Sequence, residues 1–157
     1  MMKRWIALAL VLVPVMALSS LGVPATAADG DETEVTLTMG QPTEFAFSPS
    51  EIMLKNGAET KLIIKNAGQV KHELMSVFLS SAWAKVLIEV NGVETEVAFE
   101  ELELEPGQQT ELIVIPQVPD HVLDEKGGKA EFEFGCFIKD HYKAGMKGMF
   151  IVEGEGH

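Results

Sequence analysis

From residue 34 onward the chain consists of short segments in which polar and apolar residues alternate, separated by glycine, proline and asparagine. Alternation with a period of two is typical of a strand that has one buried and one exposed face. The clearest examples are 34–38 (EVTLT), 44–47 (EFAF) and 130–134 (AEFEF). Without a long amphipathic helix, the pattern predicts an all-β fold, a Greek-key β-sandwich or barrel of about eight to ten strands.

Residues typical of turns indicate where several of these strands end. Asn56-Gly57 and Asn91-Gly92 are pairs that suit tight hairpins, so each is expected to connect two neighbouring strands. Residues 83–90 are interpreted as a strand because apolar residues alternate in its second half. Residues 120–128 are polar and are expected to form a loop.

The first 27 residues have the three parts of a secretory signal peptide: a basic start, an apolar run and the small-residue sequence Ala25-Thr26-Ala27. An uncleaved membrane anchor is the alternative, which Pro14 and Pro24 disfavour. We therefore expect cleavage near Ala27, export to the periplasm or the extracellular space, and no stable membrane insertion afterwards. The predicted organisation is a signal peptide at 1–27, an acidic N-terminal tail at 28–32 and a single domain at 33–154.

Charge narrows the choice of partners. Cleavage would remove Lys3 and Arg4 but no acidic residue, which leaves 24 acidic against 10 basic residues and a formal charge of −14 in place of −12. So acidic a surface disfavours nucleic acid and anionic membranes. Two interpretations stay open: recognition of a basic partner, or the solubility of a secreted protein.

Cys136 is the single cysteine of a chain that is expected to enter an oxidising compartment. An intramolecular disulfide is therefore excluded, and an odd secreted cysteine needs an explanation. Four roles are open to Cys136: a buried inert residue, a disulfide link between two copies of the chain, a nucleophile or a metal ligand. A nucleophile also needs a base and an orienting partner, and the sequence shows no orienting partner.

The segment around Cys136 favours the metal-ligand role. A thiol, an imidazole and a thioether follow one another at intervals of five residues, at Cys136, His141 and Met146. Soft sulfur ligands combined with imidazole select copper, Cu(I) in particular, over cations that prefer oxygen. A strand that ends at Cys136 and another that starts near Gly148 would fold the three side chains around one point. A second histidine, His72, follows a turn further upstream.

The pattern Cys-x4-His-x4-Met near the C-terminus, with an upstream histidine after Asn66-Ala67-Gly68, resembles the cupredoxins. This family includes plastocyanins, azurins and small bacterial copper proteins. His72-Glu73-Leu74 and the segment 141–146 (HYKAGM) are most similar to the bacterial periplasmic branch. The resemblance extends over roughly residues 33–153, nearly all of the mature chain.

The resemblance implies a mononuclear type 1 copper site that binds one copper ion and cycles between Cu(I) and Cu(II). His72, Cys136 and His141 would form the trigonal plane, and Met146 would be the long, weak axial ligand. Met75 is a competing thioether donor. Zinc also binds sets of two histidines and one cysteine, but a thioether is a poor zinc ligand. His121 and His157 have no cysteine or second histidine near them in the sequence and are expected to face solvent.

Two features depart from the family pattern. Glu73 stands where a polar residue such as asparagine commonly follows the first histidine. We expect its carboxylate to point outward into solvent, the alternative being a place beside the metal ligands. The stretch 77–116 is longer than in a minimal cupredoxin, and we expect it to add a hairpin near the copper end.

The function that these features indicate is an exported electron carrier without enzymatic activity. By analogy with the family, His141 would be the electron exit, within an apolar patch formed by Tyr142, Ala144, Gly145 and Met149. The expected partner is a redox protein such as a cytochrome or an oxidase that carries a basic patch. The alternative is a periplasmic copper-binding protein for copper tolerance or delivery, without redox turnover. A multicopper enzyme is disfavoured, because its further copper sites need several more histidines and the chain has only four.

Overall fold

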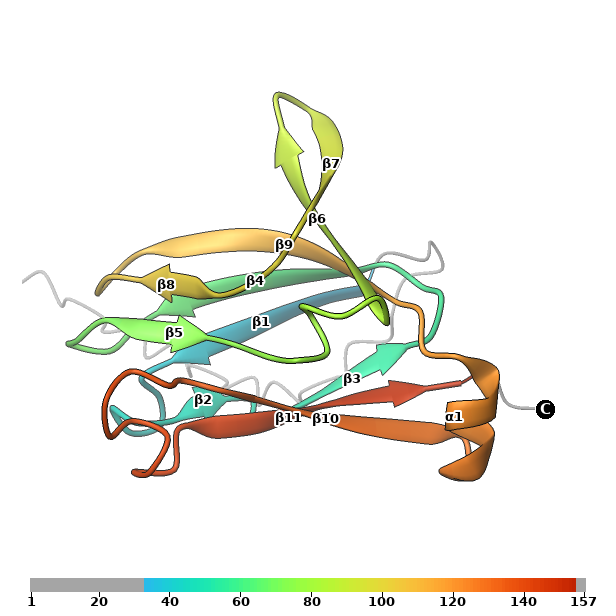
Figure 1. Cartoon of the computed structure of the whole chain (residues 1–157). Coiled ribbons are helices and arrows are strands. Elements are labelled where there is room, and N and C mark those ends of the chain that lie inside the picture. Colours follow the sequence, from blue (N-terminus) through green and yellow to red (C-terminus); the bar gives the residue numbers. More distant parts are fainter. Residues whose placement is uncertain (1–32, 155–157) are drawn as a thin grey trace, which may run out of the picture.

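The computed structural model describes residues 33–154, and within this range the chain forms eleven strands and one short helix (Figure 1). The expected all-β class is confirmed, and the signal peptide and tail predicted at 1–32 lie outside the described residues. Strands of two or three residues, too short to show a period, raise the strand number above the expected range. The elements are β1 (Thr33–Met39), β2 (Phe47–Ser48), β3 (Glu51–Lys55), β4 (Thr60–Asn66), β5 (His72–Leu74), β6 (Ala84–Val90), β7 (Val93–Val97), β8 (Leu102–Leu104), β9 (Gln109–Pro116), α1 (Asp120–Glu125), β10 (Lys129–Gly135) and β11 (Lys147–Glu153).

The strands form two principal layers and a small bridging sheet. One layer has the strand order β2-β1-β4-β9-β6-β7, the other has the order β10-β11-β3, and β5 pairs with β8. Both layers are mixed, because β1 runs parallel to β4 and β3 runs parallel to β11. Alternation along the strands buries one face of each layer, so Leu62 and Ile64 on β4 and Ile52 and Leu54 on β3 all belong to one buried core.

Aromatic side chains fill the core below the end of the sandwich where β10 terminates. The ring of Phe134 lies 4.6 Å from that of Phe150 and 5.1 Å from that of Phe47, between ring centroids. All three side chains are almost completely buried. Rings packed at such distances stabilise a core beyond the area they bury, and here they fix the position of the strand that leads into Cys136.

One of the two predicted hairpins is confirmed and the other is wrong. Asn91 and Gly92 both have positive φ angles, 54° and 79°, and connect the paired strands β6 and β7. Asn56-Gly57 instead carries the chain from one layer to the other, since β3 pairs with β11 and β4 pairs with β1 and β9. The Asn56 side chain bonds both backbone groups of Val118, which holds this crossing in place.

The expected loop at 120–128 begins with the six-residue helix α1. Only Leu123 of this helix is buried, so its sequence carries too little apolar periodicity to predict it. The long stretch 77–116 adds a hairpin, β6–β7, but its expected position near the copper end is wrong, because it projects away from the sandwich and not from the end at which β5 begins and β10 terminates (Figure 1). Strand β8 reaches back to pair with β5. Between residues 33 and 154, no helix has the length and apolar character needed to cross a membrane.

Candidate metal centre

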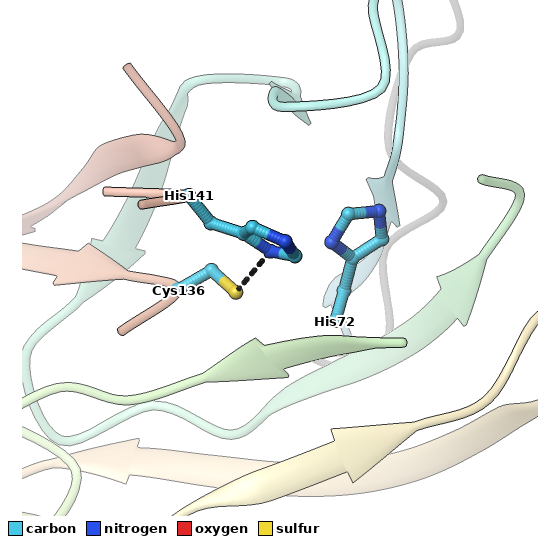
Figure 2. A group of neighbouring side chains, drawn as sticks. All are labelled: His72, Cys136 and His141. Atoms are coloured by element: carbon cyan, nitrogen blue, oxygen red, sulfur yellow. Dashed lines mark hydrogen bonds between the residues drawn. The ribbon is translucent and has the colours of Figure 1, made fainter. Parts of the chain in front are cut away.

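Three side chains from two distant parts of the chain converge at one end of the sandwich (Figure 2). His72 opens β5, Cys136 directly follows β10, and His141 lies in the loop between β10 and β11. One ligand atom from each residue lies within 4.8 Å of the other two. His72 and Cys136 are fully buried and His141 is half-buried, so His141 is the one of the three that reaches the surface.

Strand pairing and backbone hydrogen bonds shape the loop that carries Cys136 and His141. The antiparallel register of β10 and β11 places Gly135 opposite Lys147, so the segment between them must turn back on itself. Within it the Cys136 amide donates to the Met146 carbonyl (3.1 Å), and the Met146 amide donates to the His141 carbonyl (3.1 Å). These bonds place the residues spaced five apart next to one another.

Met146 is completely buried at the base of this loop. Its backbone is hydrogen-bonded to both Cys136 and His141. The competing thioether, Met75, borders a hollow on the outer surface. The role of the Met146 thioether as the fourth ligand remains a prediction.

The orientation of His72 is set by Glu44, a residue that the sequence did not single out. Nε2 of His72 lies 3.0 Å from Oε1 of Glu44, and because an ionised carboxylate only accepts, Nε2 must carry the hydrogen. The same oxygen accepts the amides of Gln69 (2.9 Å) and Val70 (3.2 Å). The Gln69 amide, and then the contact with His72, hold the pKa of Glu44 below its usual value.

The second ring nitrogen of His72 is left for a ligand. Nδ1 is buried and has no hydrogen-bond partner among the described residues, and Figure 2 shows the ring turned toward His141. A buried polar atom without a partner is costly and calls for an explanation. A metal ion bound at Nδ1 would supply the missing partner.

Glycines make room for the pair formed by Glu44 and His72. A Cβ atom on Gly68 would lie 2.4 Å from Oε1 of Glu44 and 2.7 Å from Nε2 of His72. A Cβ atom on Gly40 would in turn lie 2.5 Å from the Cα atom of Gly68. Both positions therefore admit only glycine without displacement of the neighbouring atoms.

The electrostatics around Cys136 favour a neutral thiol unless a cation is present. Burial raises the pKa of the Cys136 thiol, and the amide of Glu73, which donates to Sγ at 3.4 Å, only partly opposes this. Burial also lowers the pKa of His141, and His72 lowers it further. Sγ of Cys136 and Nδ1 of His141 lie 3.3 Å apart, within hydrogen-bond distance, so a neutral thiol and a neutral imidazole can share one hydrogen here. A metal ion would stabilise the thiolate in place of that proton.

The expectation that Glu73 points into solvent is wrong. Glu73 is only 6% exposed, and its Oε1 atom has no hydrogen-bond partner among residues 33–154. Burial raises the pKa of this carboxyl, against the opposing effect of the Phe137 amide. The side chain is buried because β5, on which it lies, is covered on all sides, as the burial of its three residues shows.

Taken together, the side chains fit a copper ion. One thiol and two imidazoles form a soft, nitrogen- and sulfur-only donor set, which suits copper better than cations that prefer oxygen. His121, expected to face solvent, is exposed on α1, and His157 lies outside the described residues. The structure thus brings together the three ligands predicted for the trigonal plane.

Comparisons with known proteins bear on the fold. No protein-family model and no curated protein matches the sequence. The chain is similar to the McoA multicopper oxidase from the hyperthermophile Aquifex aeolicus, with 12% identity and a TM-score of 0.55 over 83% of this chain. It is also similar to a multicopper oxidase from Campylobacter jejuni, a metallo-oxidase, with 13% identity and a TM-score of 0.50 over 86% of this chain. In both cases it spans 32% of the oxidase.

A third similar structure is auracyanin B, with 15% identity and a TM-score of 0.49 over 80% of this chain and 92% of that chain. At these identities the similarity concerns the fold alone. The chain has a cupredoxin-like β-sandwich, and the resemblance noted in the sequence is confirmed at that level.

Proposed function

We propose that this chain is an exported protein in which His72, Cys136, His141 and Met146 hold one copper ion, and that it transfers single electrons between redox partners. The convergence of a buried thiol and two imidazoles within 4.8 Å, one of them with an unpartnered nitrogen, carries the proposal. Bound copper would supply a one-electron centre that alternates between Cu(I) and Cu(II).

The protein's own part is to hold the ligands in place while the charge of the centre changes. Glu44 fixes the ring of His72, and the loop's backbone bonds fix Cys136 relative to Met146. The Glu73 amide is aimed at the cysteine sulfur at 3.4 Å. Ligands that are already fixed by such contacts need little rearrangement when an electron arrives or leaves.

His141 is the ligand through which electrons would leave. It is half-buried, and the ring of Phe45 packs against it with 4.8 Å between the centroids. The acidic charge of the chain supports a redox partner with a basic patch, such as a cytochrome or an oxidase. The same charge disfavours nucleic acid and anionic membranes as partners.

Burial of the donors supports electron transfer over copper delivery. A protein that hands copper to an acceptor must expose the ion to an incoming ligand. Here His72, Cys136 and Met146 are all completely buried, and only His141 reaches the surface. Such a site would exchange its metal slowly.

Visible and EPR spectra of the Cu(II) protein, followed by voltammetry, test the proposal. We expect a thiolate-to-copper absorption band and a reversible one-electron response. Cys136→Ala should abolish the band, whereas His121→Ala, which changes an exposed histidine on α1, should leave it intact. A band that persists in Cys136→Ala would refute the ligand assignment. Loss of copper at each reduction would instead favour the delivery function.

A further inference from the structure

A hollow of about 620 Å³ opens on the surface next to the metal centre. Its lining combines an apolar floor with carboxylates at the rim. The residues that line it are Met75, Ser76, Val77, Phe78, Ser80, Glu100, Glu131, Phe132, Glu133 and Phe137. The floor includes the rings of Phe78 and Phe132, which are stacked with 4.7 Å between their centroids.

Two apolar side chains at this hollow are unusually exposed. Val77 is 83% exposed and Phe137 is 54% exposed. Apolar side chains gathered at a hollow, with polar residues around them, are typical of a surface that contacts another molecule.

The charge at the rim is entirely negative. Glu100 and Glu131 are exposed, and neither forms an ion pair with another residue in the 33–154 range. Glu133 is partly neutralised, since it accepts the Tyr142 hydroxyl and lies 3.7 Å from Lys147. A cation brought to this rim would find two free carboxylates beside an apolar surface.

The ligand loop presents the opposite charge. Three of the ten lysines of the mature chain, Lys139, Lys143 and Lys147, lie within the eleven residues 137–147, where the only acidic residue is Asp140. All three lysines are exposed. A cationic molecule is therefore attracted to the hollow more strongly than to the loop around His141.

The hollow is close to the predicted electron path. Phe137 directly follows Cys136 in the chain and stacks on Tyr142 at 4.8 Å, and Tyr142 directly follows His141. On the other side, Met75 exchanges two backbone hydrogen bonds of 3.0 Å with Gly135, the residue before Cys136. A molecule seated in the hollow would thus contact Phe137, which directly follows the proposed ligand Cys136 and whose ring stacks on the residue next to His141.

We propose that this hollow docks a cationic redox protein, which seats an apolar side chain against Val77 and Phe137 and places lysines or arginines opposite Glu100 and Glu131. The inference rests on the proposed electron-transfer function and adds the location of the partner. A second copy of this chain is disfavoured as the occupant, because two acidic chains, each of formal charge −12 before signal cleavage and −14 after it, repel each other.

The experiment uses a basic cytochrome c as the probe and the full copper-loaded protein. The second-order rate constant of electron transfer is measured by stopped flow at low and at high salt. Glu100→Gln combined with Glu131→Gln should lower the rate constant about fivefold or more at low salt, and the difference should shrink as salt screens the charges. Val77→Ser should lower it at both salt concentrations.

The matched control is Glu89→Gln combined with Glu94→Gln. These two exposed residues face each other across the β6–β7 hairpin, outside the hollow, and their replacement changes the net charge by the same amount. We expect the control to alter the rate constant by less than about twofold, because only its long-range field changes. Equal slowing by both double variants, or no slowing by Glu100→Gln with Glu131→Gln, would overturn the docking site.

Direct voltammetry distinguishes this failure from a failure of the proposed function. Electron exchange with an electrode does not require the hollow, so all variants should keep the reversible response of the unaltered protein. A reversible response together with unchanged rates toward the cytochrome overturns the docking site and leaves the electron-transfer function standing. Absence of a reversible response in the unaltered protein overturns the function, and the docking site with it.

Discussion

Replacement of Glu44 by glutamine tests how this protein holds its metal centre. One carboxylate oxygen accepts from His72 Nε2 at 3.0 Å and from two backbone amides at 2.9 and 3.2 Å. Glutamine can place its carbonyl oxygen at the same point, so the three donors keep this acceptor while the negative charge disappears. The Gln69 amide loses only its second acceptor, Oε2 at 3.0 Å. The ring of His72 should therefore keep its orientation but become a weaker electron donor to a metal at Nδ1.

The structure sets the expected size of the effect. Partners that orient a metal-ligating histidine typically contribute 10- to 100-fold to metal affinity. The Glu44 side chain is 29% exposed, so water attenuates its charge and the lower end applies. We expect Glu44→Gln to weaken metal binding about tenfold, and Glu44→Leu to approach a hundredfold because His72 and the two amides then lose their acceptor.

Metal affinity is measured by competition with a chelator, and Glu59→Gln serves as the control because that carboxylate is exposed and remote from His72. Nitrogen NMR of the metal-free protein provides a second readout, since it reports which ring nitrogen of His72 carries the hydrogen. We expect Nε2–H in the unaltered protein and in Glu44→Gln. Affinities that agree within about twofold in all variants, or a hydrogen on Nδ1 in the unaltered protein, would show that Glu44 does not position the ligand.

Three further substitutions test the architecture around the centre. Gly68→Ala would place a Cβ atom 2.4 Å from Oε1 of Glu44 and 2.7 Å from Nε2 of His72. Chelator competition should therefore show a loss of metal affinity comparable to that of Glu44→Leu. Gly148→Ala would bring a Cβ atom within 2.4 Å of the Phe134 ring, and urea unfolding should show a destabilisation of about 1–3 kcal/mol. Met146→Leu conserves volume and should cost less than about 1.5 kcal/mol in the same assay. If the thioether is a ligand, this last variant should nevertheless shift the visible spectrum and the reduction potential, whereas an unchanged spectrum would assign Met146 to the core alone.

The hairpin signals illustrate where local sequence patterns reach their limit. Asn-Gly pairs favour positive φ angles wherever they occur, and Gly57 and Gly92 both adopt them. Whether the flanking strands then pair depends on which strands are available elsewhere. Strand β3 pairs with β11, from the far end of the chain, so the first turn crosses between layers and the second closes a hairpin.

The sequence by itself determined the all-β class and the compact loop from Cys136 to Met146. Both follow from short-range order: alternation decides which face of a strand is buried, and ligands five residues apart remain neighbours in almost any tight loop. The placement of His72 was predicted partly by resemblance. Its position beside Cys136 depends on the pairing of β5 with β8 and on the bridge between Met75 and Gly135.

Only the tertiary structure decided the surroundings of the ligands. Glu44 lies 28 residues before His72, and no spacing rule connects them; the close approach at Gly68 brings them together. Glu73 is a charged residue that composition alone would place in solvent, yet the strand that carries it is covered on all sides. Such contacts join residues far apart in sequence, so they are fixed by how the layers pack and not by any local pattern.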